Sequence, residues 1–262
     1  MLSVSNTAKR VLVLAGVGNA AGTGAAVARR FAKEGYSIAL LARQGKALHH
    51  IENEINRSGG HAAAFPLLSY SRDDISSTWI SVQEKFSAPE YNIRAAVFNA
   101  GQPIFKPFLE ITPEEVSNSL EVSTAAAFAF SREAILSFKG NDIEEPLGKR
   151  GTLLFTGATA SLRGSPMTSL FAAGKSGARA LSQSLAKEFG KDNIHVSHVI
   201  IDGYILTDRT RQMMGQRVGN FEANSNIRLS PESIADAFVY LTKQDRSSWT
   251  WELDLRPAHE KW

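Results

Sequence analysis

Four glycines near the start of the chain are spaced so that they could hold the phosphates of a nucleotide. They follow the apolar run Val11–Leu14, which is too short and too rich in β-branched residues for a helix. Glycine tolerates positive φ and lets a pyrophosphate approach the backbone, and the free N–H groups at the start of the helix predicted for Ala25–Ala32 attract phosphate. We therefore predict the phosphate-binding part of a dinucleotide site. Its residues are Gly16, Gly18, Gly22, Thr23 and Gly24.

The residue after the second predicted strand indicates which dinucleotide would bind. Residues 36–41 predict that strand, and in dinucleotide-binding folds its end meets the adenosine ribose. A carboxylate at this place would repel a 2′-phosphate, but the chain has Arg43 and no acid. A guanidinium matches a phosphate in charge and geometry. We therefore predict NADP(H) rather than NAD(H), with an exposed arginine at a helix start as the alternative reading of Arg43.

The glycine turn, Gly18-Asn-Ala-Ala-Gly22-Thr-Gly24, reads GxxxGxG and resembles the turn of the short-chain dehydrogenase/reductase family. An alternative alignment makes Gly16 the first family glycine, with a turn two residues longer. The resemblance covers nearly the whole chain. Three later stretches also carry it: Asn99-Ala100-Gly101, which matches the end of the family's NNAG motif, Phe171-Ala-Ala-Gly-Lys175, which keeps the Tyr-x-x-x-Lys spacing, and Asp202-Gly203-Tyr204-Ile205-Leu206-Thr207, which is similar to PGxVxT.

Family members transfer hydride between NAD(P)H and a carbonyl or alcohol, so the resemblance implies a nicotinamide site at these stretches. It implies that Lys175 binds the nicotinamide ribose and that Thr207 holds the carboxamide. The full set of cofactor-binding residues that we expect is Gly16, Gly18, Gly22, Thr23, Gly24, Arg43, Asn99, Ala100, Gly101, Lys175, Gly203, Ile205 and Thr207.

The resemblance also implies a proton donor that the chain lacks. Family enzymes place a tyrosine four residues before the lysine, on the same face of a helix. Here that residue is Phe171, whose phenyl ring has no ionisable proton. The family's serine falls on Ala158 or Thr159, and the asparagine of the preceding helix falls on Ser123. The site that the resemblance implies is therefore atypical.

Three interpretations of this site remain open. A reductase of an iminium ion needs no acid, and Asp202, which stands where the family has proline, could stabilise the cation while Phe171 faces it by cation–π attraction. Asp202 could instead only cap a turn. A carbonyl reductase would need a substitute donor from Thr159, Ser161 or Tyr204. The third interpretation is a non-redox scaffold of the same fold, such as a cyclase, an isomerase or a cofactor-sensing protein.

Alternating strand and helix patterns predict the elements that position these residues. They indicate a Rossmann-type α/β fold, a doubly wound parallel sheet of about seven strands with helices on both faces. We expect residues 1–262 to form one domain, with the irregular segment 204–227 as a substrate lid. Arg132, on a long helix predicted over 112–138, could add charge to the pocket or be an ordinary exposed arginine. The strands are expected at 11–14, 36–41, 61–68, 93–98, 151–156, 195–201 and 249–255.

Composition narrows the functional classes. The chain has 262 residues, a net charge of +3 and no cysteine, so disulfide and thiolate chemistry are excluded. Lysine and arginine are scattered, which argues against nucleic acid, and no apolar run approaches the ~20 residues of a membrane helix. No His, Asp or Glu cluster has metal-site spacing. We expect a cytoplasmic homodimer or homotetramer that acts on a small molecule without a metal.

Overall fold

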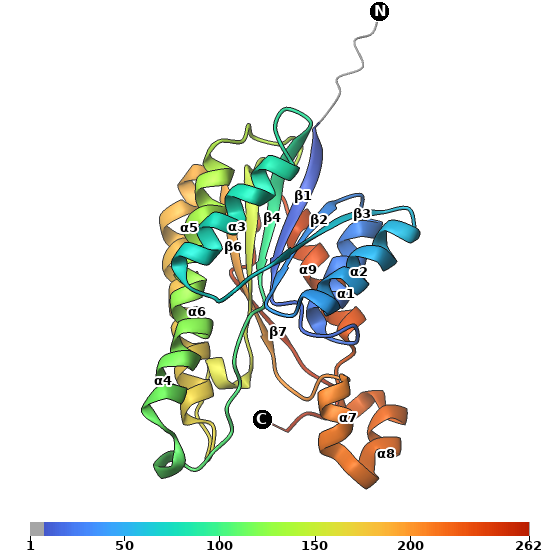
Figure 1. Ribbon diagram of the computed structural model, residues 1–262, viewed down its shortest axis with the longest axis vertical. Coiled ribbons are helices and arrows are strands. Elements are labelled where there is room, and N and C mark those ends of the chain that lie inside the picture. Colours follow the sequence, from blue (N-terminus) through green and yellow to red (C-terminus); the bar gives the residue numbers. More distant parts are fainter. Residues whose placement is uncertain (1–7, 262) are drawn as a thin grey trace, which may run out of the picture.

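The computed structural model describes residues 8–261, and its centre is one sheet of seven parallel strands. The strand order is β3-β2-β1-β4-β5-β6-β7 (Figure 1). Successive strands are added on one side of β1 up to β3 and on its other side from β4 onward, so the order of addition reverses between β1 and β4. In open parallel sheets, ligands bind beyond the carboxyl ends of the strands at such a reversal. The strands are β1 (Lys9–Ala15), β2 (Ser37–Ala42), β3 (His61–Pro66), β4 (Tyr91–Phe98), β5 (Gly151–Thr156), β6 (Ile194–Ile201) and β7 (Glu252–Leu255). The predicted Rossmann-type fold is confirmed.

Helices cover both faces of the sheet. One face carries α1 (Thr23–Lys33), α2 (Gly45–Arg57) and α9 (Pro231–Lys243), and the other carries α3 (Arg72–Lys85), α5 (Ala126–Lys139) and α6 (Ser169–Phe189) (Figure 1). None of the helices within residues 8–261 is long and apolar enough to span a bilayer.

The apolar run in β1 follows from burial on both faces. Leu12 and Leu14 pack in the core under α1, α2 and α9, whereas Val11 and Val13 pack in the core under α3, α5 and α6. All four are fully buried. Because this part of β1 is covered on both faces, its apolar side chains do not alternate with polar ones. Its short continuous apolar pattern, bounded by glycine, was the correct signal for a strand.

The long helix predicted over 112–138 begins as expected but is interrupted. Thr112 caps α4 (Pro113–Leu120) in a capping box with Glu115, in which each side chain accepts a hydrogen bond from the other residue's backbone N–H. A π-helical turn, Glu121–Ala125, then separates α4 from α5. It contains Ser123, against which α6 packs closely, because a Cβ on Gly174 would lie 2.7 Å from Ser123 Cβ.

The segment 204–227 lies beyond the carboxyl ends of the strands, at the lower right of Figure 1. It contains two short helices, α7 (Asp208–Met214) and α8 (Val218–Ala223), where the sequence has little periodicity. A bridge between Ile205 and Leu229 ties its start to the chain that leads into α9. The lid function that we assign to this segment remains a prediction.

Candidate dinucleotide and catalytic site

The glycine turn after β1 is held against the loop after β4 by contacts that leave no room for side chains. Gly16 has a φ of +99°, and a Cβ there would lie 2.4 Å from the backbone nitrogen of Ala100. A Cβ on Gly24 would lie 2.6 Å from the Gly16 carbonyl oxygen. The Asn99 side-chain amide donates to that same oxygen at 2.7 Å. The structure therefore brings the glycine turn and the Asn99–Gly101 stretch together.

Gly18, between these close contacts, faces open space instead. Nothing lies within 4 Å of a Cβ built on Gly18. Gly22 is the N-cap of α1, so within the described chain no side chain caps this helix, and its first turn carries no acidic residue. The uncapped N–H groups and the positive end of the helix dipole fit an anion. This part of the site therefore suits a pyrophosphate.

Arg43 lies beside this turn. The Gly16 N–H donates to the Leu41 carbonyl at 2.9 Å, which places the end of β2 next to the glycines. Arg43 is exposed, and its guanidinium carbon lies 5.4 Å from the centre of the Tyr70 ring. Tyr70 is buried, and burial raises the pKa of its phenol to about 12. A neutral ring thus supports an exposed cation at the place expected for a 2′-phosphate.

Lys175 joins three elements at the same edge of the sheet. It lies on α6 with only 8% of its surface exposed, and its Nζ donates to the carbonyl of Thr156 at 2.7 Å. A Cβ on Gly101, in the loop after β4, would lie 3.6 Å from this Nζ. Burial lowers the pKa of Lys175 to about 8. This amine can therefore exchange a proton near neutral pH.

Phe171 lies one helical turn before Lys175 and belongs to a stack of rings and a cation. Its ring centre is 5.4 Å from that of Phe105, in a T-shaped arrangement. The guanidinium carbon of Arg209, on α7, is 5.8 Å from the centre of the Phe105 ring. The stack connects α6, the loop after β4 and the segment 204–227. It offers aromatic faces, but no acidic proton, at this position.

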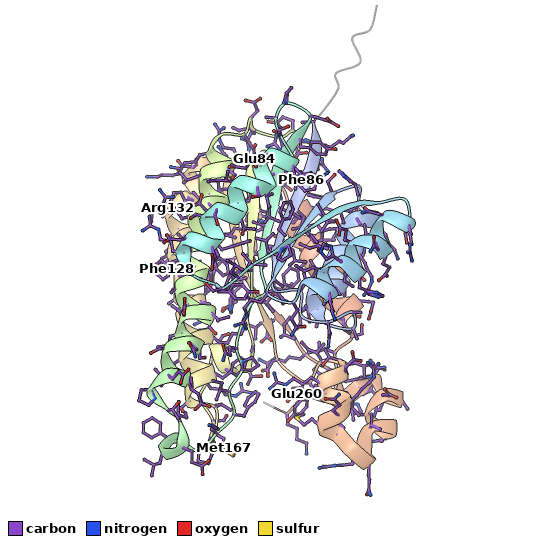
Figure 2. The ribbon with its side chains drawn as sticks, viewed as in Figure 1. Glu84, Phe86, Phe128, Arg132, Met167 and Glu260 are labelled. Carbon is purple, nitrogen blue, oxygen red and sulfur yellow. The ribbon has the colours of Figure 1, made fainter. Side chains whose placement is uncertain are left out.

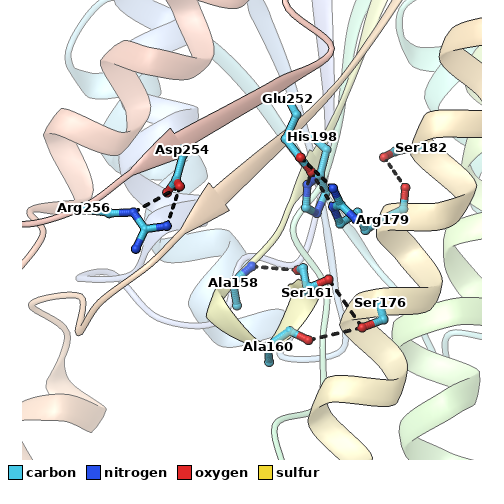
Figure 3. Close-up of polar contacts among 10 residues, drawn as sticks. All are labelled: Ala158, Ala160, Ser161, Ser176, Arg179, Ser182, His198, Glu252, Asp254 and Arg256. Carbon is cyan, nitrogen blue, oxygen red and sulfur yellow. Dashed lines mark hydrogen bonds and ion pairs between the residues drawn. The ribbon is translucent and has the colours of Figure 1, made fainter. Parts of the chain in front are cut away.

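Asp202, at the end of β6, is engaged inside the protein. The residue is 1% exposed, and its carboxylate accepts a hydrogen bond from the Thr159 hydroxyl. The same carboxylate lies 2.6 Å from Arg256 Nη1 and 3.6 Å from Arg163 Nη2. Arg256 also pairs with Asp254 at 2.6 Å (Figure 3). Asp202 therefore ties β6 to the loop after β5 and to the segment after β7.

The three hydroxyls predicted as substitute proton donors differ in their engagement. Thr159 donates to Asp202, and Ser161, which is 4% exposed, accepts the Ala158 N–H at 3.0 Å (Figure 3). Tyr204 is 54% exposed, and its hydroxyl has no hydrogen-bond partner among residues 8–261. Thr159 therefore already donates its proton to Asp202, whereas the hydroxyl protons of Ser161 and Tyr204 have no acceptor among residues 8–261.

The predicted nicotinamide stretch leads from β6 into the segment 204–227. Gly203 has a φ of +146°, and a Cβ on it would lie 2.8 Å from Pro257 Cδ, so the segment after β7 supports this turn. Ile205 pairs with Leu229. Thr207 caps α7, and its hydroxyl accepts the Thr210 N–H at 3.3 Å. The stretch is therefore a defined connection from the sheet edge to α7.

A comparison with known proteins agrees with this geometry. A family model described as short chain dehydrogenase matches residues 9–217, most of the chain. The chain belongs to the short-chain dehydrogenase family. Members of this family use a nicotinamide cofactor, which fits the glycine turn and the uncapped start of α1.

Several short-chain dehydrogenases resemble this chain along most of its length. The 3-oxoacyl-acyl-carrier-protein reductase FabG of Chlamydia trachomatis is 26% identical over 235 residues, which cover 88% of this chain and 89% of the relative. A crystal structure of a short-chain dehydrogenase from Rhodopseudomonas palustris has 28% identity and a TM-score of 0.74, covering 95% of this chain and 98% of that one. A metagenomic short-chain oxidoreductase in complex with NADP, 22% identical with a TM-score of 0.76, covers 98% of this chain and 100% of its own, and supports the fold.

Arg132 does not lie with the other predicted residues of this short-chain dehydrogenase. It is exposed on α5 and pairs with Glu133 at 3.1 Å, and the Glu133 carboxylate accepts a hydrogen bond from Ser76 of α3. Figure 2 places Arg132 on the outer side of the molecule, away from the lower end where Met167 and Glu260 lie. Of the two readings of Arg132, a pocket charge or an ordinary exposed arginine, this solvated ion pair fits the second, which is the usual state of a helical arginine.

Sequence reasoning missed Arg256, Phe105 and His198. Arg256 and Phe105 lie in irregular segments, and their partners are distant in sequence. One signal could have pointed to a residue such as Arg256. An acid such as Asp202 at the end of a buried strand requires a compensating positive charge somewhere in the chain. His198 lies inside a buried strand, and its polar partner is on the neighbouring strand, since its Nδ1 lies 3.0 Å from Glu252 Oε2.

Proposed function

We propose that the protein is an NADP(H)-dependent reductase of a cationic C=N substrate, an iminium ion or an imine that is already protonated when it binds, in a site without a phenolic proton donor. The observation that carries this proposal is the Phe171 ring, stacked on Phe105 one turn before the buried Lys175. The reducing direction is suggested by the FabG-type relatives, whose names describe reductases.

The cofactor part of the proposal depends on the first half of the sheet. Gly18 and the start of α1 would hold the pyrophosphate, Arg43 the 2′-phosphate, and Lys175 the nicotinamide ribose. When bound, NADPH supplies the hydride. Arg43 favours NADPH because a guanidinium on a neutral ring attracts a phosphate dianion, whereas no carboxylate is present there to bind an unmodified ribose.

The substrate part depends on charge. Hydride addition to an iminium carbon yields a neutral amine, so no proton has to be delivered. The Phe171 ring can stabilise the cation by ~0.5–2 kcal/mol, while the Phe105 ring beside it already contacts the Arg209 guanidinium. Asp202 is compensated by Arg163 and Arg256, so we assign the cation to the Phe171 ring and a structural role to the carboxylate.

A matched pair of substrates tests this assignment. N-methyl-3,4-dihydroisoquinolinium and the neutral ketone 1-tetralone have similar shapes, and NADPH oxidation is followed by its absorbance. The wild type should reduce the iminium and leave the ketone nearly untouched. Phe171→Tyr should gain at least ~10-fold on the ketone, because a phenol can then donate a proton. Phe171→Leu should slow iminium reduction while leaving NADPH affinity unchanged. A wild type that reduces only the ketone, with no gain from Phe171→Tyr, would contradict the proposal.

A carbonyl reductase that uses Tyr204 is the second candidate, because this hydroxyl is exposed and follows Gly203 directly. In that case Tyr204→Phe should abolish ketone reduction. Under the iminium proposal the same variant should change iminium turnover by less than about 2-fold, since no proton is needed.

The nucleotide preference has its own test. Arg43→Ser should weaken NADPH binding ~10–100-fold, as expected for loss of a charged hydrogen bond, and should leave NADH binding unchanged. Arg57→Ser, at the far end of α2, is the matched surface control and should change neither affinity. Fluorescence titration measures both nucleotides. Equal weakening of NADH and NADPH by Arg43→Ser would refute the 2′-phosphate role.

A further inference from the structure

We propose that His198 is a positioning residue for Lys175, acting through the backbone of Gly157. His198 is fully buried in β6, where it is in register with Phe155 of β5 and Glu252 of β7. Its imidazole fills the space that a side chain at position 157 would need, because a Cβ on Gly157 would lie 2.4 Å from both Cε1 and Nε2. This inference rests on the role of Lys175 in the proposed function.

Gly157 directly follows Thr156, whose carbonyl binds the Lys175 ammonium. The carbonyl of Thr156 accepts the hydrogen bond from Lys175 Nζ at 2.7 Å, and the Gly157 N–H donates to the Val199 carbonyl, also at 2.7 Å. The peptide unit between these two residues is therefore fixed on one side by β6 and on the other by the imidazole. Moving the ring would move the acceptor of the Lys175 ammonium.

Two further side chains fix the ring. His198 Nδ1 lies 3.0 Å from Glu252 Oε2, and the Glu252 carboxylate forms a bidentate pair with Arg179 at 2.6 and 2.8 Å (Figure 3). Arg179 is four residues after Lys175 on α6, so both side chains project from one face of the helix toward the sheet. The contacts thus close a circuit that starts and ends on α6 and passes through β5, β6 and β7.

The charges around the ring favour a neutral imidazole. Burial lowers the pKa of His198, the Glu252 carboxylate raises it, Lys175 and Arg179 lower it, and the net value is about 4. A hydrogen bond to a carboxylate requires a proton on Nδ1, which leaves Nε2 as a bare acceptor. Within residues 8–261, Nε2 has no hydrogen-bond partner and faces Gly157. A neutral imidazole can therefore pack against Gly157 and hold the Thr156 carbonyl in place without adding a positive charge near Lys175.

The same strand offers a matched control. His195 is also buried in β6, and burial lowers its pKa to about 4 as well. Its Nε2 bonds the Thr250 carbonyl at 2.9 Å, and its ring stacks on Trp249 with centres 5.1 Å apart. Truncating His195 should therefore destabilise the protein without reaching Gly157 or Lys175.

The experiment compares His198→Ala with His195→Ala in the full chain without substrate. The pKa of Lys175 is followed by NMR of protein with 13C-labelled lysine, assigned from the Lys175→Arg spectrum, and NADPH affinity by fluorescence. His198→Ala should raise the Lys175 pKa by about one unit, because water reaches the ammonium, and weaken NADPH at least ~5-fold. His195→Ala should change neither. His198→Gln, which keeps a polar side chain of similar length, should recover part of both effects.

A second variant pair keeps the test decisive if His198→Ala does not fold. Gly157→Ala should perturb Lys175 and NADPH binding in the wild type, because its Cβ meets the imidazole, and should do so less in combination with His198→Gln. Glu252→Gln should shift the Lys175 pKa in the same direction as His198→Ala. Unchanged Lys175 pKa values in all of these variants, or equal shifts in the His195 variant, would overturn the proposal. Because no substrate is present, absence of imine reductase activity leaves this result unaffected.

Discussion

The two halves of the carboxyl edge of the sheet differ in whether the backbone or side chains shape them. In the half built from β1, β2 and β4, the backbone shapes the site: Gly16 and Gly24 allow close contacts, and the start of α1 leaves its N–H groups uncapped. In the half built from β5, β6 and β7, side chains from distant segments contact one another, and Thr159, Ser161 and Asp202 all have protein partners. The first half is therefore prepared for a ligand that comes from outside, whereas the second is stabilised mainly from within.

Substitutions at two glycines should break the first half in two distinct ways. Gly16→Ala combines a positive φ with a Cβ 2.4 Å from the Ala100 nitrogen, so we expect a loss of more than about 4 kcal/mol in the free energy of unfolding. Gly18→Ala should unfold like the wild type and bind NADPH at least ~10-fold more weakly, because its Cβ enters only the space for the ligand. Denaturation and nucleotide titration measure the two effects. If Gly18→Ala binds NADPH normally, the pyrophosphate does not lie there.

Removing the buried charge should break the second half. Asp202→Asn leaves Arg256 and Arg163 without their shared carboxylate, and we expect a loss of about 3 kcal/mol in the free energy of unfolding. Asp254→Asn is the control, because this partner of Arg256 is much more exposed, and it should cost less than about 1 kcal/mol. Similar losses in both variants, measured by urea denaturation, would mean that burial does not determine the value of this carboxylate.

Acid should weaken the second half through its two buried histidines. Burial lowers the pKa values of His195 and His198 to about 4, below the ordinary value of 6.5. The unfolded chain therefore binds more protons between these values, and stability falls as the pH falls from 6.5 towards 4. Each histidine should contribute about 1–2 kcal/mol of the loss between pH 7 and pH 5. His195→Gln should remove part of this slope. An unchanged slope would show that the histidines titrate normally.

Arg132 lies in neither half of the site and should matter least. Its pair with Glu133 is exposed on α5, so Arg132→Ala should change the free energy of unfolding by less than about 0.5 kcal/mol. NADPH affinity and turnover should equal those of the wild type. A clear loss of NADPH affinity or of turnover would instead support the alternative that Arg132 adds charge to the pocket.

The sequence was sufficient wherever structure depends on local pattern. The strand predicted at 151–156 is β5 to the residue, and the helix predicted from residue 112 begins there, with Thr112 as the N-cap of α4. The π-helical turn at Glu121–Ala125 was not predicted, because it has no Gly or Pro signal. The short helices α7 and α8 were also missed, since they are too short to show a period.

The candidate site was predictable to a different extent in each half. The glycines follow a spacing that a phosphate-binding turn favours, Asn99 belongs to a motif of the family that the sequence resembles, and the structure brings them together. The engagement of Asp202 could not be foreseen, because its partners Thr159 and Arg256 come from segments remote in sequence. Which side chains compensate a charge depends on tertiary packing, and residue types alone do not specify that.

The pairing of Asp202 with Arg256 also has a consequence for synthesis. The chain emerges from its amino end, and domains tend to fold in that order. The glycine turn, Asn99 and β5 can assemble early, but Asp202 lacks its nearest guanidinium until residue 256 has been translated. During that interval the carboxylate has to remain hydrated. The region around Asp202, at the carboxyl end of β6, should therefore exclude water only late in synthesis, after Arg256 has been added.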